Sequence, residues 1–178
     1  PEELNPRNIL HWKEGKITYI KQNFFSPEED ESIEIVDDKL IESISNLIID
    51  SVKKRIPDHK FGLLFSGGLD STIIAFILKK LKADFTAYFC SAKGNDDEIA
   101  RVKKIAKEIG FKLKTIEVKP AELIKTLPGI ISTIESTDPV KVEVGSTIYF
   151  AVKKASKDGI RVLFIGSGAD DIFFGYKR

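Results

Sequence analysis

The chain has 178 residues, of which 42% are hydrophobic and 31% charged, a composition typical of a soluble globular protein with a core of useful size. Its formal net charge of +1 and its lack of long apolar runs indicate neither nucleic acid nor a membrane as a partner. The single cysteine, Cys90, excludes an internal disulfide framework and fits a cytoplasmic location. Cys90 follows an apolar, strand-like run, so we interpret it as a core residue rather than a nucleophile.

Residues 1–36 are predicted to form an extended N-terminal segment and a linker. Within them, residues 16–20 alternate in polarity like a strand and follow the turn signal Glu14-Gly15. The acidic stretch 26–31 is typical of a solvated linker. A packing helix is expected from Asp37 onward, and its apolar stripe consists of Ile41, Ile44, Leu47, Ile48 and Val52. We therefore place a domain boundary between residues 36 and 37.

The next stretch, residues 61–81, carries the strongest chemical signal. Residues 61–65 are typical of a buried strand, Ser66-Gly67-Gly68 must turn sharply, and an apolar-rich helix begins near Asp70. Two glycines at such a turn let backbone N–H groups point into one concavity, and the helix N-terminus adds partial positive charge. The pattern predicts an anion site, with phosphate as the best candidate. The alternative is an ordinary glycine turn before a helix that starts with Asp-Ser-Thr.

Two features separate this turn from a Walker A loop. It has no Lys at the required place, and it is too short for that spacing. It also carries a carboxylate, Asp70, near the expected phosphate. Because two anions repel each other unless a cation lies between them, Asp70 implies bound Mg²⁺.

Strands and helices then alternate to the end of the chain. Strands are expected at residues 85–90, 113–118 and 160–165, with helices at 96–109, at 121–135 (one helix, or two broken at Pro128-Gly129) and at about 145–157. This alternation predicts an α/β fold with an open, mostly parallel sheet and helices on both faces. Ligands on such sheets bind beyond the carboxyl ends of the strands.

The last strand leads into a second glycine loop with acidic residues, Gly166-Ser167-Gly168-Ala169-Asp170-Asp171. If its strand runs parallel to the first, both loops emerge at the same edge of the sheet. Asp70 and Asp170 then face each other across a cleft that holds phosphates and Mg²⁺. Taken alone, Asp171 is more simply explained as a favourable charge at a helix N-terminus.

Both loops resemble motifs of one family. The string Ser66-Gly67-Gly68-Leu69-Asp70-Ser71-Thr72 resembles the PP-loop of the N-type ATP pyrophosphatases, above all the synthetase domain of glutamine-dependent asparagine synthetases and their β-lactam synthetase relatives. Residues 166–176 look like the second conserved loop of asparagine synthetases, and 135–139 and 145–149 look like two of their shorter motifs. The resemblance runs in register over residues 37–178.

The resemblance implies a Rossmann-like, three-layer fold that binds ATP. The residues it places at the nucleotide are Phe65, Ser66, Gly67, Gly68, Asp70, Ser71, Tyr88 (to adenine, through its backbone), Ile165 and Gly166, and those it places at Mg²⁺ are Asp70 and Asp170. It also implies a carbon–nitrogen ligase. Such an enzyme activates a carboxylate, aspartate in this family, as an acyl-adenylate with release of pyrophosphate, and ammonia or glutamine-derived nitrogen then displaces AMP.

One departure concerns the expected catalytic residues, Ser167 and Asp171. Ser167 stands where asparagine synthetases carry a Glu tied to the β-aspartyl-AMP intermediate, and a hydroxyl cannot replace a carboxylate's charge or proton transfer. Either Asp171 substitutes for that Glu or the acceptor is not aspartate. Two alternatives therefore stay open: another adenylating ligase on the same scaffold, similar to β-lactam synthetase, and a non-catalytic nucleotide-binding domain.

The resemblance also bears on the two ends of the sequence. Residues 12–17 resemble the closing hairpin of the glutaminase domain that precedes the synthetase domain, so residues 1–36 are interpreted as a remnant of such a domain. The family's later helices, with a Lys that steadies the adenylated intermediate, would follow Arg178. We therefore expect the synthetase domain, residues 37–178, to be incomplete at its C-terminus. The sequence leaves the oligomeric state open, a homodimer included.

Overall fold

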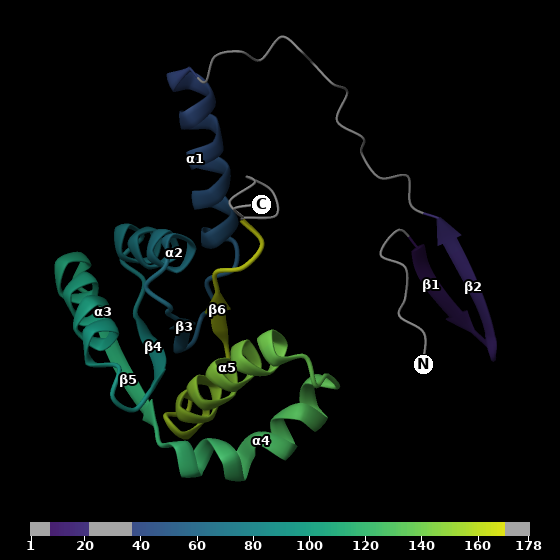
Figure 1. Cartoon of the computed structure of the whole chain (residues 1–178). Helices are drawn as coiled ribbons and strands as arrows, with labels where there is room; N and C mark the ends of the chain where they lie inside the picture. The colour runs from purple at the N-terminus through teal and green to yellow at the C-terminus, as the bar shows by residue number, and fades with distance from the viewer. Residues whose placement is uncertain (1–7, 22–36, 170–178) are drawn as a thin grey trace. The chain divides into compact units, whose positions relative to one another are not determined.

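The computed structural model describes residues 8–21 and 37–169, and the chain divides into two units, residues 1–42 and 43–178 (Figure 1). The boundary predicted between residues 36 and 37 stays a prediction. Helix α1 (Asp38–Lys53) begins one residue after Asp37 and runs through the division between the units. No helix in the described part of the chain is long and apolar enough to cross a membrane.

The first unit contains an antiparallel hairpin of β1 (Asn8–Lys13) and β2 (Lys16–Lys21). Glu14 and Gly15 connect the strands and both have positive φ, 50° and 79°, as a two-residue type I′ turn requires. The predicted strand and turn are confirmed, whereas β1 was not predicted as a strand. Every residue of the hairpin after Asn8 is exposed. A two-stranded hairpin of this kind is marginal by itself in water.

The second unit is built on a four-stranded sheet with the order β5-β4-β3-β6. Its strands are β3 (Phe61–Leu64), β4 (Phe85–Ala92), β5 (Lys112–Val118) and β6 (Leu163–Ile165). All three strand pairs are parallel. The predicted open parallel sheet is therefore confirmed, and β3, which precedes the first glycine loop, is the direct neighbour of β6, which precedes the second.

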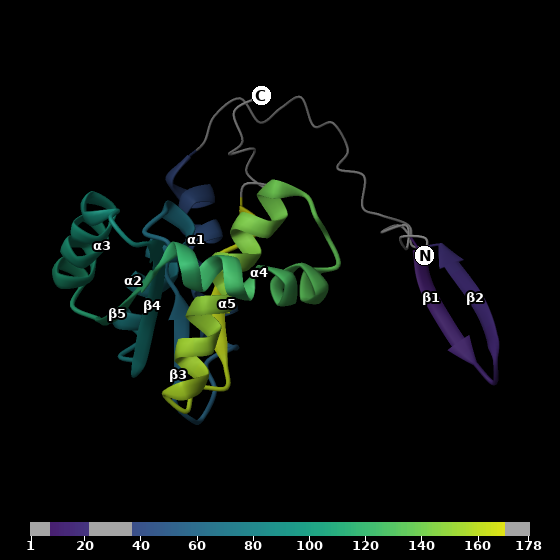
Figure 2. The same ribbon diagram turned by 60° about the horizontal axis from the view of Figure 1, so that its bottom comes forward.

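Helices cover both faces of this sheet (Figures 1 and 2). On one face α2 (Leu69–Lys80), α3 (Asp96–Ile109) and the end of α1 pack on a core that includes Phe61, Leu78 and Val102. On the other, α4 (Pro120–Ile134) and α5 (Pro139–Lys157) pack on a second core that includes Tyr88 and Phe150. The result is the predicted three-layer α/β arrangement.

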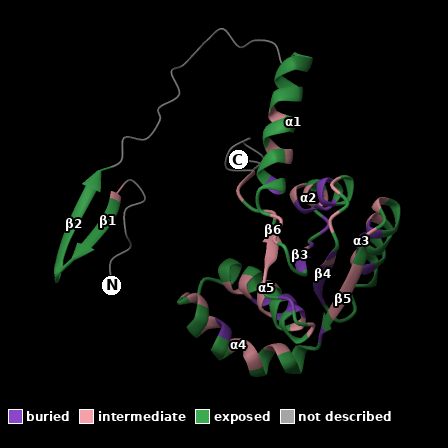
Figure 3. Cartoon of the chain, turned by 180° about the vertical axis from the view of Figure 1, so that it is seen from behind, coloured by how far each residue is buried: buried purple, intermediate pink, exposed green. Residues whose placement is uncertain are grey.

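The predicted stripe of α1 is only partly correct. Val52 is buried, with Ile48 and Ile49 packed beside it, but Leu47 is 68% exposed and Ile41 is 51% exposed. Figure 3 shows that most of α1 is exposed and that its buried part lies at its C-terminal end. The stripe predicts which side of the helix is apolar, but it cannot show that only the last turns meet the sheet.

Two helices on the other face differ in extent from the prediction. α4 is a single helix with Pro128 inside it. α5 begins at Pro139, six residues before the predicted start, because Asp138 caps it by accepting a hydrogen bond from the backbone N–H of Lys141 at 2.9 Å. Gly145, which was interpreted as the helix start, instead lies inside α5, where a Cβ would come within 3.1 Å of the Ile134 side chain.

A polar network joins the end of α5 to the sheet. The Asp158 carboxylate accepts hydrogen bonds from Lys114 Nζ and Lys154 Nζ, both at 2.6 Å, and from the Tyr88 hydroxyl at 3.0 Å. The two ammonium groups hold the pKa of Asp158 well below its usual range. Burial, assisted by the hydrogen bond to Asp158, raises the pKa of Tyr88 to about 12.

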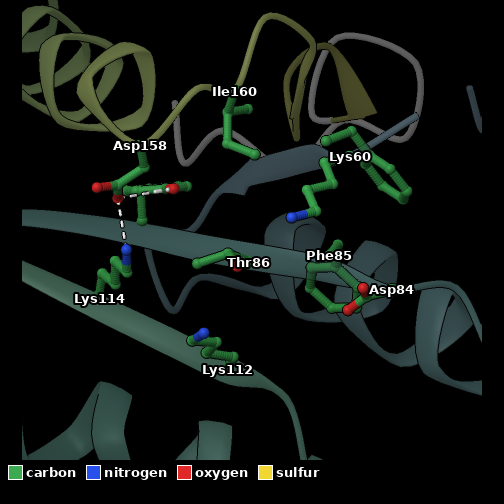
Figure 4. A pocket seen from close by; sticks show the side chains of 10 residues that line it. Lys60, Asp84, Phe85, Thr86, Lys112, Lys114, Asp158 and Ile160 are labelled. Atoms are coloured by element: carbon green, nitrogen blue, oxygen red, sulfur yellow. Dashed lines mark hydrogen bonds and ion pairs between the residues drawn. The ribbon is translucent and has the colours of Figure 1, made fainter.

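This network borders a hollow of about 200 Å³ at the amino ends of β3, β4 and β5 (Figure 4). Lys60, Asp84, Thr86 and Lys112 complete much of its lining. The hollow therefore lies at the opposite edge of the sheet from the two glycine loops. The network fastens α5 to β4 and β5 at this far edge.

We predict that Asp158→Asn lowers the free energy of unfolding by about 1 kcal/mol at pH 7, since it removes two charge-assisted hydrogen bonds from partly exposed ammonium groups. The pKa of Asp158 is lower in the folded than in the unfolded chain. The stabilisation that the Asp158 charge provides is therefore fully present above the unfolded pKa, about 4, and declines as the pH falls below it.

Urea unfolding of the wild type and of Asp158→Asn at a series of pH values measures this stabilisation. The difference from wild type should shrink on acidification, while Lys157→Gln, an exposed neighbour, should change little. A difference that does not vary with pH would contradict the assigned role of the charge.

Candidate functional site

The candidate site lies where the two glycine loops meet, at the carboxyl ends of β3 and β6. Leu64 pairs with Ile165 at the last register position of the two strands, so both loops leave the sheet side by side. A Cβ on Gly166 would lie 2.9 Å from the backbone nitrogen of Ser71 and 3.1 Å from Cβ of Asp70. The backbone of the second loop therefore rests directly on the first turn of α2, and only glycine allows this approach.

The first loop has the backbone shape of an anion site. Gly67 has a φ of 72°, and a Cβ there would lie 2.7 Å from Cγ1 of Val102 on α3. Gly68 is the N-cap residue of α2, and no side chain caps that helix. The first-turn N–H groups of α2 therefore carry the helix's partial positive charge without a side-chain acceptor, as anion-binding helix ends do.

Two serine hydroxyls brace this loop from within. Ser66 Oγ accepts a hydrogen bond from the Gly68 N–H at 3.2 Å and lies 3.0 Å from Ser71 Oγ. Ser71 is only 3% exposed, and its Oγ accepts from the Ser66 N–H at 3.3 Å and donates to the Gly68 carbonyl at 3.2 Å. Ser66 is exposed and can turn toward a ligand, whereas Ser71 mainly holds the loop. A phosphate contact by either residue stays a prediction.

The carboxylate expected at Mg²⁺, Asp70, lies in the first turn of α2 and is partly exposed. Within residues 8–21 and 37–169, no three His, Cys, Asp or Glu side chains gather as a ready-made metal site. Asp70 fits a magnesium ion that takes its other ligands from phosphate and water. Asp170 and Asp171 lie outside the described residues, so the facing of Asp70 and Asp170 and the role of Asp171 stay predictions.

Two of the residues expected beside the adenine base, Phe65 and Tyr88, have side chains that make contacts within the protein instead. The Phe65 ring is 2% exposed and packs edge-on against Phe111, with the centroids 5.1 Å apart. The Tyr88 carbonyl accepts the Phe65 N–H at 2.9 Å, and its phenol is bound to Asp158. That carbonyl already accepts a hydrogen bond within the sheet, and the backbone contact to adenine stays a prediction. Ile165, by contrast, is exposed at the edge.

The structure therefore brings most of the predicted set together. The residues that it gathers at one edge of the sheet are Ser66, Gly67, Gly68, Asp70, Ser71, Ile165 and Gly166. Ser167 is exposed and follows directly in the second loop.

Burial, assisted by the nearby charge of Glu122, raises the pKa of the Cys90 thiol to about 11, which agrees with a core residue and not with a nucleophile.

The sequence prediction missed one residue of the site, Arg101. Its Nη1 donates a hydrogen bond of 2.7 Å to the Gly67 carbonyl, across 34 positions of the chain. The periodicity of α3 correctly predicts that Val102 is buried, but an exposed cation beside it carries no signal of its own. Arg101 contacts Gly67 because α3 passes next to the first glycine loop, and this arrangement is seen only in the structure.

Comparison with known sequences gives a consistent result. The profile of the family described as asparagine synthase matches residues 43–178. A putative glutamine-hydrolyzing asparagine synthetase of Methanocaldococcus jannaschii is 31% identical over 138 residues, which are 77% of this chain and 25% of that protein. The glutamine-hydrolyzing asparagine synthetase of Homo sapiens is 31% identical over 148 residues, which are 76% of this chain and 26% of that protein. The chain thus spans about a quarter of the length of these relatives.

Solved structures share the fold at low sequence identity. An NH3-dependent NAD synthetase from Campylobacter jejuni aligns with a TM-score of 0.52 and 17% identity, over 76% of this chain and 60% of that one. An NMN synthetase from Francisella tularensis also aligns with a TM-score of 0.52, at 19% identity, over 81% of this chain and 60% of that one. These similarities confirm the predicted fold class.

We predict that Gly166→Ala separates the two loops. The added methyl group would meet the backbone of α2, which cannot move aside as a side chain can, so the free energy of unfolding should fall by about 1–3 kcal/mol. Thermal or urea unfolding measures the change. Gly129→Ala is the matched control: a Cβ there meets nothing within 4 Å, and in the interior of α4 alanine should stabilise by up to about 1 kcal/mol. Equal stability of Gly166→Ala and wild type would show that the loops do not touch.

Proposed function

The chain belongs to the asparagine synthase family, and from this premise we propose that it is the ATP-binding part of an AMP-forming carbon–nitrogen ligase. The observation that carries the proposal is the meeting of two glycine loops over the uncapped N-terminus of α2, with Asp70 in its first turn. Backbone N–H groups, partial positive charge and a carboxylate that can share a cation are what a bound triphosphate requires.

The proposed reaction has two steps. A substrate carboxylate, aspartate in the first instance, attacks the α-phosphate of ATP, which forms an acyl-adenylate and releases pyrophosphate. Ammonia then attacks the acyl carbon and displaces AMP, which leaves an amide. The loop after β3 would hold the β- and γ-phosphates as the leaving group. The protein thus acts by positioning and by stabilising charge rather than by covalent chemistry.

Magnesium fits this site by the chemistry of its donors. Asp70, with Asp170 as the second expected ligand, supplies the carboxylate oxygens that Mg²⁺ prefers alongside phosphate oxygens and water. When bound, the ion would neutralise charge on the phosphates that the loop amides hold. Asp70 sits at the positive end of α2, so its carboxylate stays close to the loop without being buried.

A second candidate function rests on Ser167. This exposed hydroxyl stands at the position of the family's Glu, so the acceptor could be a carboxylate other than aspartate, as in β-lactam synthetase-like ligases. If aspartate is the substrate, Asp171 is the proposed replacement for that Glu. The nitrogen source is also a proposal: the hairpin of β1 and β2 fits the end of a glutaminase domain, which would supply ammonia from glutamine.

We predict that the full-length protein converts ATP to AMP and pyrophosphate when a suitable carboxylate and ammonia are supplied. A panel that contains aspartate and other amino-acid carboxylates, with nucleotide products separated by chromatography, tests the reaction and distinguishes the two candidate substrates. Release of ADP and phosphate as the main products would rule out the proposed bond cleavage. ATP binding without turnover on any carboxylate would favour a binding domain instead.

We predict that Asp70→Asn weakens ATP binding about tenfold or more in the presence of Mg²⁺, because it removes a metal ligand. Without Mg²⁺ the same change removes a carboxylate that repels phosphate, so the affinity should stay the same or rise. Titration calorimetry with and without the metal measures both effects. Asp97→Asn, which removes the same charge from the first turn of α3, is the control and should change neither. Equal weakening in both conditions would contradict a metal-mediated role.

A further inference from the structure

We propose that Arg101 is a positioning residue that clamps the peptide between Gly67 and Gly68, so that the Gly68 N–H stays turned toward the phosphate of ATP. The inference deepens the proposed function and rests on it for the identity of the ligand. The clamp itself is a property of the chain without ligand. Arg101 lies on α3, outside every motif of the two loops.

The Gly67 carbonyl and the Gly68 N–H belong to the same peptide unit, so a contact that holds one of them also orients the other. Arg101 Nη1 donates to the Gly67 carbonyl at 2.7 Å, a length typical of a charge-assisted bond. The same planar unit carries the Gly68 N–H on its other side. Fixing the oxygen on the α3 side therefore fixes the N–H on the opposite side. That N–H has a long bond of 3.2 Å to Ser66 Oγ, a hydroxyl on an exposed residue that a phosphate oxygen can displace.

A clamp is needed here because glycines flank the peptide on both sides. Glycine adopts positive and negative φ almost equally well, so a Gly-Gly peptide can rotate at little cost. Rotation would exchange the two ends of the unit and aim the Gly67 carbonyl at the anion, which would repel it. Val102, fully buried behind Gly67, limits the space, and Arg101 beside it supplies the electrostatic preference for one orientation.

The guanidinium also strengthens the donor that it orients. A positively charged group that is hydrogen-bonded to the carbonyl oxygen polarises the peptide, so the N–H of that peptide unit becomes a stronger donor. Nη2 lies 3.4 Å from the point where a Gly67 Cβ would stand, and Nη1 lies 3.1 Å from it, so the planar fork lies along the loop backbone. A lysine ammonium has the charge but lacks that planar shape. We therefore expect Lys to replace Arg101 only in part.

The first measurement is made without nucleotide. Arg101→Gln should shift the amide ¹H and ¹⁵N signals of Gly68 and speed its hydrogen exchange, and Arg101→Lys should have a smaller effect. Lys104→Gln removes the same charge from an exposed position of the same helix and should leave the Gly68 signals unchanged. Because Arg101 is itself exposed, these variants leave the core intact, which the melting temperature verifies.

The second measurement is the affinity for Mg²⁺-ATP by titration calorimetry. Arg101→Gln should weaken binding about tenfold, as expected for loss of a charge-assisted hydrogen bond, Arg101→Lys by less, and Lys104→Gln by under about twofold. Wild-type affinity in Arg101→Gln would overturn the inference. Weakened affinity with unchanged Gly68 signals would also overturn it, because Arg101 would then contact phosphate directly. If the wild-type protein binds no ATP, the proposed function fails, and unchanged Gly68 signals in Arg101→Gln would separately reject the clamp.

Discussion

The parallel pairing of β3 with β6 is the constraint on which the site depends. These strands are far apart in the sequence, and their register brings Leu64 beside Ile165, so two separate glycine turns leave the sheet at one point. Gly166 then lies against the first turn of α2, where a single added methyl group would not fit. Without this pairing each loop is a local turn with acidic residues. With it they meet at the N-terminus of α2, where we propose the anion site.

The two ends of the parallel strands, called here the carboxyl edge and the amino edge of the sheet, differ in their electrostatics. At the carboxyl edge, backbone N–H groups and the end of α2 present positive potential that no side chain caps, which suits a ligand with several negative charges. At the amino edge, the Asp158 carboxylate accepts hydrogen bonds from Lys114, Lys154 and Tyr88, so this charge is already paired within the protein. Tyr88 belongs to both edges, since its carbonyl bonds Phe65 beside the loop while its phenol meets Asp158. The ligand site is proposed at the carboxyl edge because the two glycine loops and the uncapped N-terminus of α2 lie there.

The sequence predicts the fold class and most of the site because both depend on local patterns. Apolar runs followed by glycine turns mark strands whose ends carry chemistry, and all four strands of the sheet lie where they were predicted. The start of α5 was missed because the pair Asp138-Pro139 suggests a loop as readily as a cap. The exposure of Leu47 was missed because a helical stripe does not tell how far the neighbouring layer extends. Arg101 was missed because its contact with Gly67 depends on how α3 crosses behind the loop, a tertiary property without a sequence signature.

The two loops differ in how firmly the sheet holds them. β3 pairs on both sides, with β4 and β6, whereas β6, at three residues, pairs only with β3 within the part of the chain that the structure describes. Substitutions after β3 therefore disturb a strand anchored from two directions, and substitutions after β6 disturb one anchored from a single direction. We therefore expect a change of sequence in the second loop to disturb the sheet less than a change in the first. Ser167 lies in the second loop, which follows the strand that the described sheet holds from one side only.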